Sequence, residues 1–259
     1  MRWRRALLMV ACGFAAGTAW ADDAARDHVV GCMRANIPQS VQVKEVELTA
    51  TDRTGGKRVL RGRLYGTRVD ERLRAMIKIE SPSDLAGAAY LMRENGGGDD
   101  MYVYVPALRK VRRITGSAAD NSLWGTDISY GDVKQINNAF SAGQVDLLGE
   151  SELSGHKVHM LALHPAPETD SRFGLIRLWV DQASCVTIQA EFVEGQTVRK
   201  RLVVAPDGLR QTGEHWYAAD AQMSDLQEGT STRLKVLGVS SDLNLSGRYF
   251  NPSTFYIGN

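Results

Sequence analysis

The sequence has little cysteine: only Cys12, Cys32 and Cys185 occur among its 259 residues, and none of them forms a CxxC pair. Redox catalysis is therefore not expected. An excess of charge of one sign is also lacking, with 31 Lys and Arg against 30 Asp and Glu. This balance gives no reason to expect nucleic acid as a partner. After residue 21, no apolar run reaches the roughly 20 residues of a transmembrane helix, so we expect a soluble mature chain.

The sequence signatures of common catalytic classes are missing as well. There is no G-x-S-x-G elbow, no Walker loop and no dinucleotide fingerprint. His156 and His159 form an H-x-x-H in a segment with a strand pattern, where this spacing puts the imidazoles on opposite faces. Asp99 and Asp100 follow three glycines, and Asp is an ordinary turn residue. We expect no enzyme, metal or cofactor, although a site assembled from scattered residues would leave no signature.

The N-terminus has the order of a cleavable secretory signal peptide: arginines, a short apolar run and a small-x-small cleavage site. These features are Arg2, Arg4 and Arg5, residues 6–16, and Ala19-Trp20-Ala21. A lipoprotein signal ending at Cys12 and an uncleaved anchor remain as alternatives. Cleavage after Ala21 would leave one domain over residues 22–259. Its net charge would be about −2, because the removed residues 1–21 contain three arginines and no acids.

Cys32 and Cys185 remain in the mature chain. The oxidising compartment reached by an exported protein favours a disulfide between them, and the alternative is two buried free thiols. Closing so long a loop would add about 4 kcal/mol to the free energy of unfolding.

Most of the mature chain has the pattern of short strands separated by glycine-containing turns. The expected strands are residues 41–48, 59–69, 74–80, 88–93, 100–105, 111–115, 144–148, 156–163, 175–181, 186–193, 197–204, 211–219 and 231–239. Helical pattern is found over 26–36, over 130–139 with Asp127 or Ser129 as the cap, and in a short turn near 243–249. The sequence therefore predicts a mainly β fold, one curled antiparallel sheet with a few short helices.

Residues 100–132 form the most unusual segment. A strand that carries Tyr102 and Tyr104 on one face is broken by Pro106. A basic cluster follows, made of Arg109, Lys110, Arg112 and Arg113. A loop of small residues then carries Leu123 and Trp124, and could act as a lid over a cavity. Two other interpretations remain open: a solvated strand face for the basic cluster, and plain core for Trp124.

This segment resembles the outer membrane lipoprotein-sorting protein family, the periplasmic carriers of the Lol type (LolA and LolB) and their relatives. The resemblance is carried by Tyr104-x-Pro106, by the basic run ending in Arg113-Ile114, and by Ser122-Leu-Trp-Gly-Thr-Asp127-Ile-Ser-Tyr130-x-Asp132. Tyr102 stands where family members commonly have Trp, which leaves any Trp-specific contact in doubt. A weaker likeness is Leu178-Trp-Val-Asp181, followed by Cys185 and Glu191-Phe192.

The resemblance implies an incomplete, half-open β-barrel whose open side is covered by helices and loops. Its concave apolar face would shelter the acyl chains of a lipid or lipoprotein in the periplasm, without enzyme chemistry. The candidate lipid-binding residues are Tyr102, Tyr104, Leu123, Trp124, Ile128 and Tyr130. The candidates for contact with head groups or a partner are Arg109, Lys110, Arg112 and Arg113.

We therefore expect a monomeric periplasmic carrier that takes lipid or lipoprotein toward the outer membrane. Its expected partners are its cargo, an inner-membrane exporter and an outer-membrane acceptor. A lipid-sensing or exporter-accessory binding module and a hydrolase of envelope lipids are the alternatives. A sensor should stay attached to a membrane or a second domain, which favours the carrier.

Overall fold

The computed structural model of the protein describes residues 17–95, 98–136, 143–242 and 247–257. The α-helices in these residues are α1 (Gly17–Ala35) and α2 (Asp132–Ile136). The strands are β1 (Val41–Thr51), β2 (Lys57–Val69), β3 (Arg72–Ser81), β4 (Ala89–Arg93), β5 (Asp100–Val105), β6 (Lys110–Ile114), β7 (Gly143–Leu153), β8 (His156–Pro165), β9 (Leu175–Asp181), β10 (Thr187–Glu194), β11 (Thr197–Val204), β12 (Leu209–Thr212), β13 (His215–Ala218), β14 (Asp220–Asp225) and β15 (Thr230–Asp242). Short 3-10 helices are η1 (Pro106–Leu108), η2 (Gly116–Asp120), η3 (Pro167–Thr169) and η4 (Gly247–Phe250).

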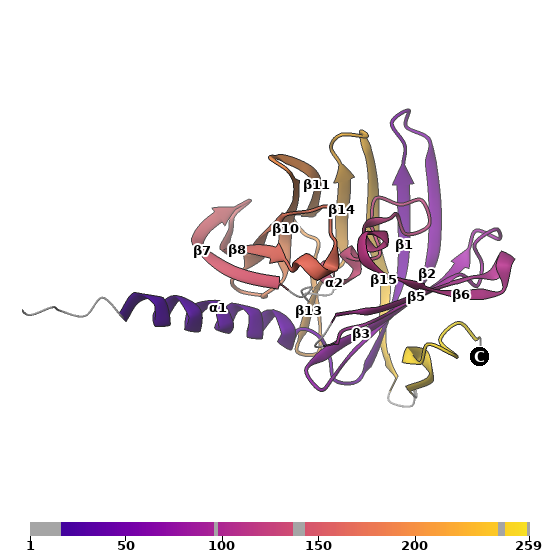
Figure 1. The fold of residues 1–259 in the computed structure, drawn as a ribbon, viewed down its shortest axis with the longest axis horizontal. Coiled ribbons are helices and arrows are strands. Elements are labelled where there is room, and N and C mark those ends of the chain that lie inside the picture. Colours follow the sequence, from indigo (N-terminus) through magenta and orange to yellow (C-terminus); the bar gives the residue numbers. More distant parts are fainter. Residues whose placement is uncertain (1–16, 96–97, 137–142, 243–246, 258–259) are drawn as a thin grey trace, which may run out of the picture.

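One large antiparallel sheet contains all the strands except β12 and β13, in the order β6-β5-β4-β3-β2-β1-β15-β14-β11-β10-β9-β8-β7. The first meander runs from β1 to β6 and the second from β7 to β11, and β14 and β15 join them. β1 pairs with β15 from Val41 opposite Asp242 to Thr51 opposite Ser231. The terminal strands β6 and β7 do not pair with each other, so the curled sheet is not closed (Figure 1). The predicted mainly β, half-open architecture is confirmed.

The sheet is apolar on both faces over its first meander. On the concave first face, α1 and residues 123–133 pack against the strands in the larger core; Figure 1 shows the sheet curling around α2. On the second face, Met76 and Leu91 are covered by residues 249–256. The run 88–92 is buried throughout because Tyr90 packs on the first face and its neighbour Leu91 on the second.

The helices differ from the prediction in their bounds. α1 begins at Gly17 rather than at residue 26, and it ends at Ala35, before Pro38. α2 starts at Asp132, and the part of the predicted helix after residue 136 lies outside the described residues. The turn expected near 243–249 is described only from Gly247, where η4 begins. The proposed cleavage after Ala21 falls within α1 and stays a prediction.

Ser129, three residues before the first residue of α2, forms a reciprocal pair of hydrogen bonds with Asp132. Its Oγ accepts the Asp132 N–H at 3.3 Å, and Asp132 Oδ2 accepts the Ser129 N–H at 2.8 Å. This reciprocal pair satisfies two backbone donors at the start of the helix. Asp127, the other expected cap, binds Thr230 and Thr232 instead.

The prediction of a single strand over residues 211–219 is wrong. The chain forms the β12–β13 hairpin there, with a turn at Gly213 (φ +59°), and the unpredicted strand β14 follows. A glycine allows this positive φ without strain.

A disulfide joins α1 to the connection between β9 and β10. Cys32 and Cys185 have Cα atoms 5.8 Å apart and are separated by 153 residues in sequence. The predicted bond is therefore present. Within the described residues, neither helix has both the length and the apolar character that crossing a bilayer requires.

Candidate functional site: a cavity at the open side of the sheet

A cavity of about 310 Å³ lies on the first face, between strands of the two meanders. β4, β5 and β6 supply one wall, and β9, β10 and the η3 region supply the opposite wall. α2 and η2 contribute between them. The lining residues are Met92, Gly98, Asp99, Met101, Ile114, Thr115, Gly116, Ala119, Asp120, Tyr130, Gly131, Asp132, Lys134, Pro165, Glu168, Thr169, Ser171, Phe173, Ile176 and Phe192.

The deep walls of the cavity are apolar. Met92, Phe173, Ile176 and Phe192 are at most 4% exposed. The rings of Phe173 and Phe192 meet edge to face with centroids 5.4 Å apart. Met101 and Ile114 stand opposite each other on β5 and β6 and are half-buried. Alternation along the strands brings these side chains to the same face. An apolar group that entered this space would be removed from water.

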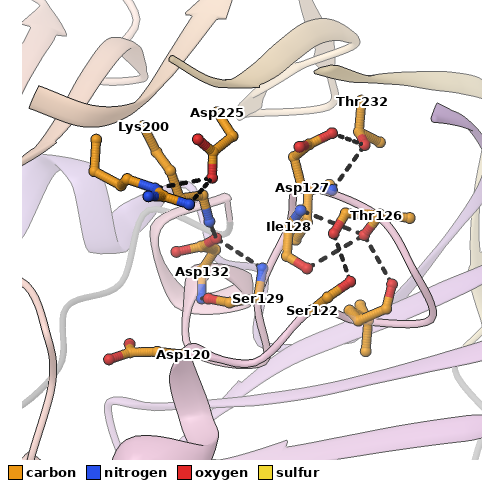
Figure 2. A network of polar contacts seen from close by, with 12 residues as sticks. Asp120, Ser122, Thr126, Asp127, Ile128, Ser129, Asp132, Lys200, Asp225 and Thr232 are labelled. Carbon is orange, nitrogen blue, oxygen red and sulfur yellow. Dashed lines mark hydrogen bonds and ion pairs between the residues drawn. The ribbon is translucent and has the colours of Figure 1, made fainter. Parts of the chain in front are cut away.

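Two lysine–aspartate pairs lie among the apolar walls. Lys134 Nζ is 2.9 Å from Asp99 Oδ2, and its side chain is 3% exposed. Lys200 pairs with Asp132, whose carboxylate also accepts the Ser129 N–H at the start of α2 (Figure 2). The Lys200 amine lies 5.4 Å from the centre of the Phe192 ring. The cavity therefore combines apolar surface with buried charge.

A wider ion network connects this region to α1. Glu94 accepts hydrogen bonds from the Arg34 guanidinium at 2.8 Å and from the Leu73 N–H at 2.9 Å, and it lies 4.0 Å from Lys134 Nζ. Burial alone would raise the pKa of Glu94, but these donors outweigh it and the pKa is lowered. For Asp99 burial prevails, and its pKa is raised although Lys134 lies beside it.

Asp120 fixes the two 3-10 segments at the cavity. Its Oδ2 accepts the Arg172 N–H at 2.6 Å, and its Oδ1 lies 3.3 Å from Ser171 Oγ. The Arg172 guanidinium is farther away, at 3.9 Å. Burial raises the pKa of Asp120 and outweighs these contacts. The desolvation cost of the Asp120 carboxylate is thus only partly offset by its hydrogen-bond donors.

The six candidate lipid-binding residues do not lie together. Tyr130 lines the cavity, and burial raises the pKa of its hydroxyl. Leu123 and Ile128 are buried in the first-face core, and Trp124 packs against it half-buried. Tyr102 and Tyr104 lie on the second face, where Tyr104 stacks on Tyr256 with ring centroids 4.1 Å apart.

The loop that contains Trp124 is bonded to itself and to the sheet. The Leu123 N–H donates to the Ile128 carbonyl at 2.8 Å. Thr232 on β15 donates from Oγ1 to the Asp127 carboxylate at 2.7 Å and accepts the Asp127 N–H at 2.8 Å (Figure 2). Thr230 binds the same carboxylate. The polar residues of the recognised motif therefore anchor this loop across the first face.

The basic cluster is divided between the two faces of the edge strand β6. Arg112 and Lys110 share the face of Ile114, which lines the cavity. Arg113 lies on the opposite face and pairs with Asp100 at 2.9 Å. Arg109 precedes the strand in a left-handed conformation (φ 48°). Within the described residues, Arg109, Lys110 and Arg112 form no ion pair, and all are exposed.

The histidines of the H-x-x-H point to different partners. His156 Nδ1 lies 2.9 Å from Asp181, and His159 Nδ1 lies 3.4 Å from Glu150. In the part of the chain that the structure describes, no group of three or more His, Cys, Asp and Glu residues is placed to hold a metal ion.

Comparison with known proteins places the chain in a family. A family model described as an uncharacterized protein matches residues 71–255. The chain belongs to this DUF1329-like family. No curated protein matches the chain.

Solved structures share the fold of this DUF1329-like chain. A DUF1329 family protein from Desulfovibrio piger has a TM-score of 0.80 and 21% identity, covering 90% of this chain and 98% of its own. A domain described as an outer membrane lipoprotein-sorting protein, from Vibrio parahaemolyticus, has a TM-score of 0.78 and 21% identity. The match covers 88% of this chain and 97% of that domain. A LolA superfamily protein from Nitrosomonas europaea has a TM-score of 0.67 and 16% identity. The match covers 87% of this chain and 97% of that protein. The resemblance predicted from residues 100–132 is confirmed.

Sequence analysis did not propose the charged and aromatic residues that line the cavity as site residues, apart from Tyr130. Asp99 resembles an ordinary turn residue in sequence, yet it is paired with a buried lysine. Phe173 and Asp120 come from loops that carry no motif. The available signals were motif residues that line the cavity: Ile114 and Asp132 in the main resemblance, and Phe192 in the weaker one.

Proposed function

We propose that this protein binds acyl chains of a lipid or lipoprotein in the cavity and carries them through the periplasm toward the outer membrane. The observation that carries the proposal is the apolar cavity at the open side of the sheet, walled by Met92, Phe173, Ile176 and Phe192. Sharing a fold with a domain described as an outer membrane lipoprotein-sorting protein supports it.

The driving force for binding is the removal of hydrocarbon from water, about 0.8 kcal/mol for each methylene. A cavity of about 310 Å³ is at the small end of the range for ligand sites. It therefore suits part of a chain, with the rest of the cargo outside. Because the sheet is open between β6 and β7, such a ligand enters and leaves without breaking a strand pair.

A carrier requires neither a nucleophile nor a cofactor, and we propose a non-enzymatic role on this basis. β6 ends at the cavity-lining Ile114. Arg109, just before this strand, and Lys110 and Arg112 within it are exposed and are the proposed contacts for a head group or a partner. The proposed partners are an inner-membrane exporter and an outer-membrane acceptor. Export by the signal peptide over residues 1–21 would bring the monomeric chain between them.

The first test is native mass spectrometry of protein purified from periplasm, followed by binding of a radiolabelled phospholipid. We expect co-purified lipid in the wild type. Ile114→Trp should lower lipid retention at least fivefold, because the indole would fill space in the cavity. Val111→Trp is the matched control, since it places the same bulk on the same strand but on the opposite, exposed face.

The proposal fails if no lipid is bound in either assay. It also fails if the two tryptophan variants lose lipid equally, because the cavity would then not be the site. Circular dichroism of both variants shows that each retains the folded sheet.

A further inference from the structure

The polar part of the cavity lining is strongly biased toward acids. Asp99, Asp120, Asp132 and Glu168 line it, and Lys134 is the one cation among the lining residues that the structure describes. Glu168 is exposed at the rim, whereas the side chains of Asp99 and Asp120 are 13% and 9% exposed. Two carboxylates are therefore nearly buried at an apolar surface.

These two carboxylates keep unused acceptor capacity. An ionised carboxylate accepts about four hydrogen bonds. Among the described residues, Asp120 Oδ1 accepts only from the Ser171 hydroxyl, at 3.3 Å, and the Arg172 guanidinium is 3.9 Å from Oδ2. Asp99 shares Lys134 with Glu94. Burial raises the pKa of both Asp99 and Asp120 in spite of these neighbours. An additional N–H donor would thus be stabilised here.

We infer that the cavity selects amphipathic ligands whose polar end is a protonated amine, with Asp99 and Asp120 as acceptors and the alkyl chain against Phe173 and Phe192. This inference rests on the proposed function, because it names the lipid class that the same cavity takes. The amine forms charge-assisted hydrogen bonds, which are stronger than those of a neutral hydroxyl.

An anionic polar end is disfavoured at the same position. A fatty-acid carboxylate or a phosphate would meet Asp99 and Asp120 at close range, and like charges repel most strongly where water is excluded. The third buried acid, Asp132, is already paired with Lys200. Lys134 is already held by two acids. Lys110 and Arg112, which form no ion pair with any described residue, lie farther along β6 and do not line the cavity. They act on groups outside it.

The test compares three ligands of the same chain length: dodecylamine, dodecanol and dodecanoate. Each displaces a fluorescent fatty-amine probe from the purified mature protein at pH 7, below its micelle concentration. We expect dodecylamine to bind at least tenfold tighter than dodecanoate, with dodecanol between them.

Asp120→Asn is the decisive variant. Its amide oxygen still accepts the Arg172 N–H, but the negative charge is removed, so the amine-to-carboxylate preference should fall at least fivefold while dodecanol binding changes less than twofold. Asp84→Asn is the control, because the Asp84 side chain is 65% exposed and outside the cavity lining. It should leave all three affinities unchanged.

The possible outcomes separate the inference from the proposed function. Equal binding of the three ligands, or preference for dodecanoate, overturns the inference and leaves the carrier intact. Failure of all three to bind, and of the labelled phospholipid above, contradicts the carrier itself. If Asp120→Asn does not fold, the order of the three affinities in the wild type still tests the inference.

Discussion

Lys44 is a half-buried amine of β1 with an aromatic neighbour in place of an acid. Its Nζ lies 4.7 Å from the centre of the Tyr217 ring. In the described residues no ion pair includes this lysine. Desolvation lowers the pKa of Lys44 to about 8, compared with about 10.4 for an unperturbed lysine. The folded protein therefore holds this proton less tightly than the unfolded chain does.

Lys44 should make stability rise with pH between about 8 and 10.4. In this window the unfolded chain binds more protons, so the free energy of unfolding increases as pH rises, and below pH 8 the desolvation cost is fully present. We expect Lys44→Met to be more stable than wild type at pH 7, by at most about 3 kcal/mol, and by much less at pH 10. Urea unfolding at both pH values measures this.

Lys57→Met is the control for this experiment, because Lys57 is exposed on β2. It should change stability by less than about 0.5 kcal/mol at either pH. An equal gain for Lys44→Met at pH 7 and pH 10 would show that packing, rather than the charge, sets its effect.

Single residues were predictable where their chemistry is local or rare. Ser129 was one of two expected caps, because a cap acts within three residues, and Cys32 had one possible partner in the mature chain. Asp120 could not be assigned, since its main contact, Arg172, is 52 residues away in sequence. The sequence does not distinguish an exposed loop aspartate from one that a distant loop buries.

The helix α1 is held to the sheet by contacts of different kinds. Val29 and Met33 are buried in the first-face core. The Arg34 guanidinium donates to Glu94 at 2.8 Å, and Cys32 is bonded to Cys185 in the β9–β10 connection. The helix thus contacts the first meander through the ion pair and the second through the disulfide.

Removing this disulfide should cost stability without abolishing the sheet. The bond restricts an unfolded loop of 153 residues in sequence separation, and loss of a native disulfide typically lowers the free energy of unfolding by about 2–5 kcal/mol. We expect this loss for the double variant Cys32→Ala, Cys185→Ala, measured by urea unfolding monitored by circular dichroism. Dithiothreitol should destabilise the wild type similarly and leave the double variant unchanged; an effect on the double variant would contradict the assignment.

Most strands were predictable because polar and apolar residues alternate within each segment. Which face of each strand lines the concave side of the sheet was not predictable. Tyr102 and Tyr104 share one face in both prediction and structure. Alternation does not say which face is concave, and residues 249–256 cover the face that carries these tyrosines. The packing of residues 249–256 against β5 brings together distant parts of the chain, so no local sequence pattern could indicate it.

The two meanders form one body because β15 pairs with β1 on one side and with β14 on the other. The cavity depends on this connection, since Ile114 comes from the first meander and Phe192 from the second. Neither meander alone has the walls of the site. Ligand binding is therefore expected to stabilise both meanders together.

The mature chain should consequently unfold in a single cooperative transition, as one domain over residues 22–259. Two variants would each keep one tryptophan of the mature chain, Trp124 in the first-face loop or Trp179 on β9, with the others replaced by Phe. Their fluorescence should give the same urea midpoint as the circular dichroism of the same variant. A ligand that binds the folded state raises both midpoints together. Separated midpoints would mean that the meanders fold independently, and a cavity walled by both would then exist only after they dock.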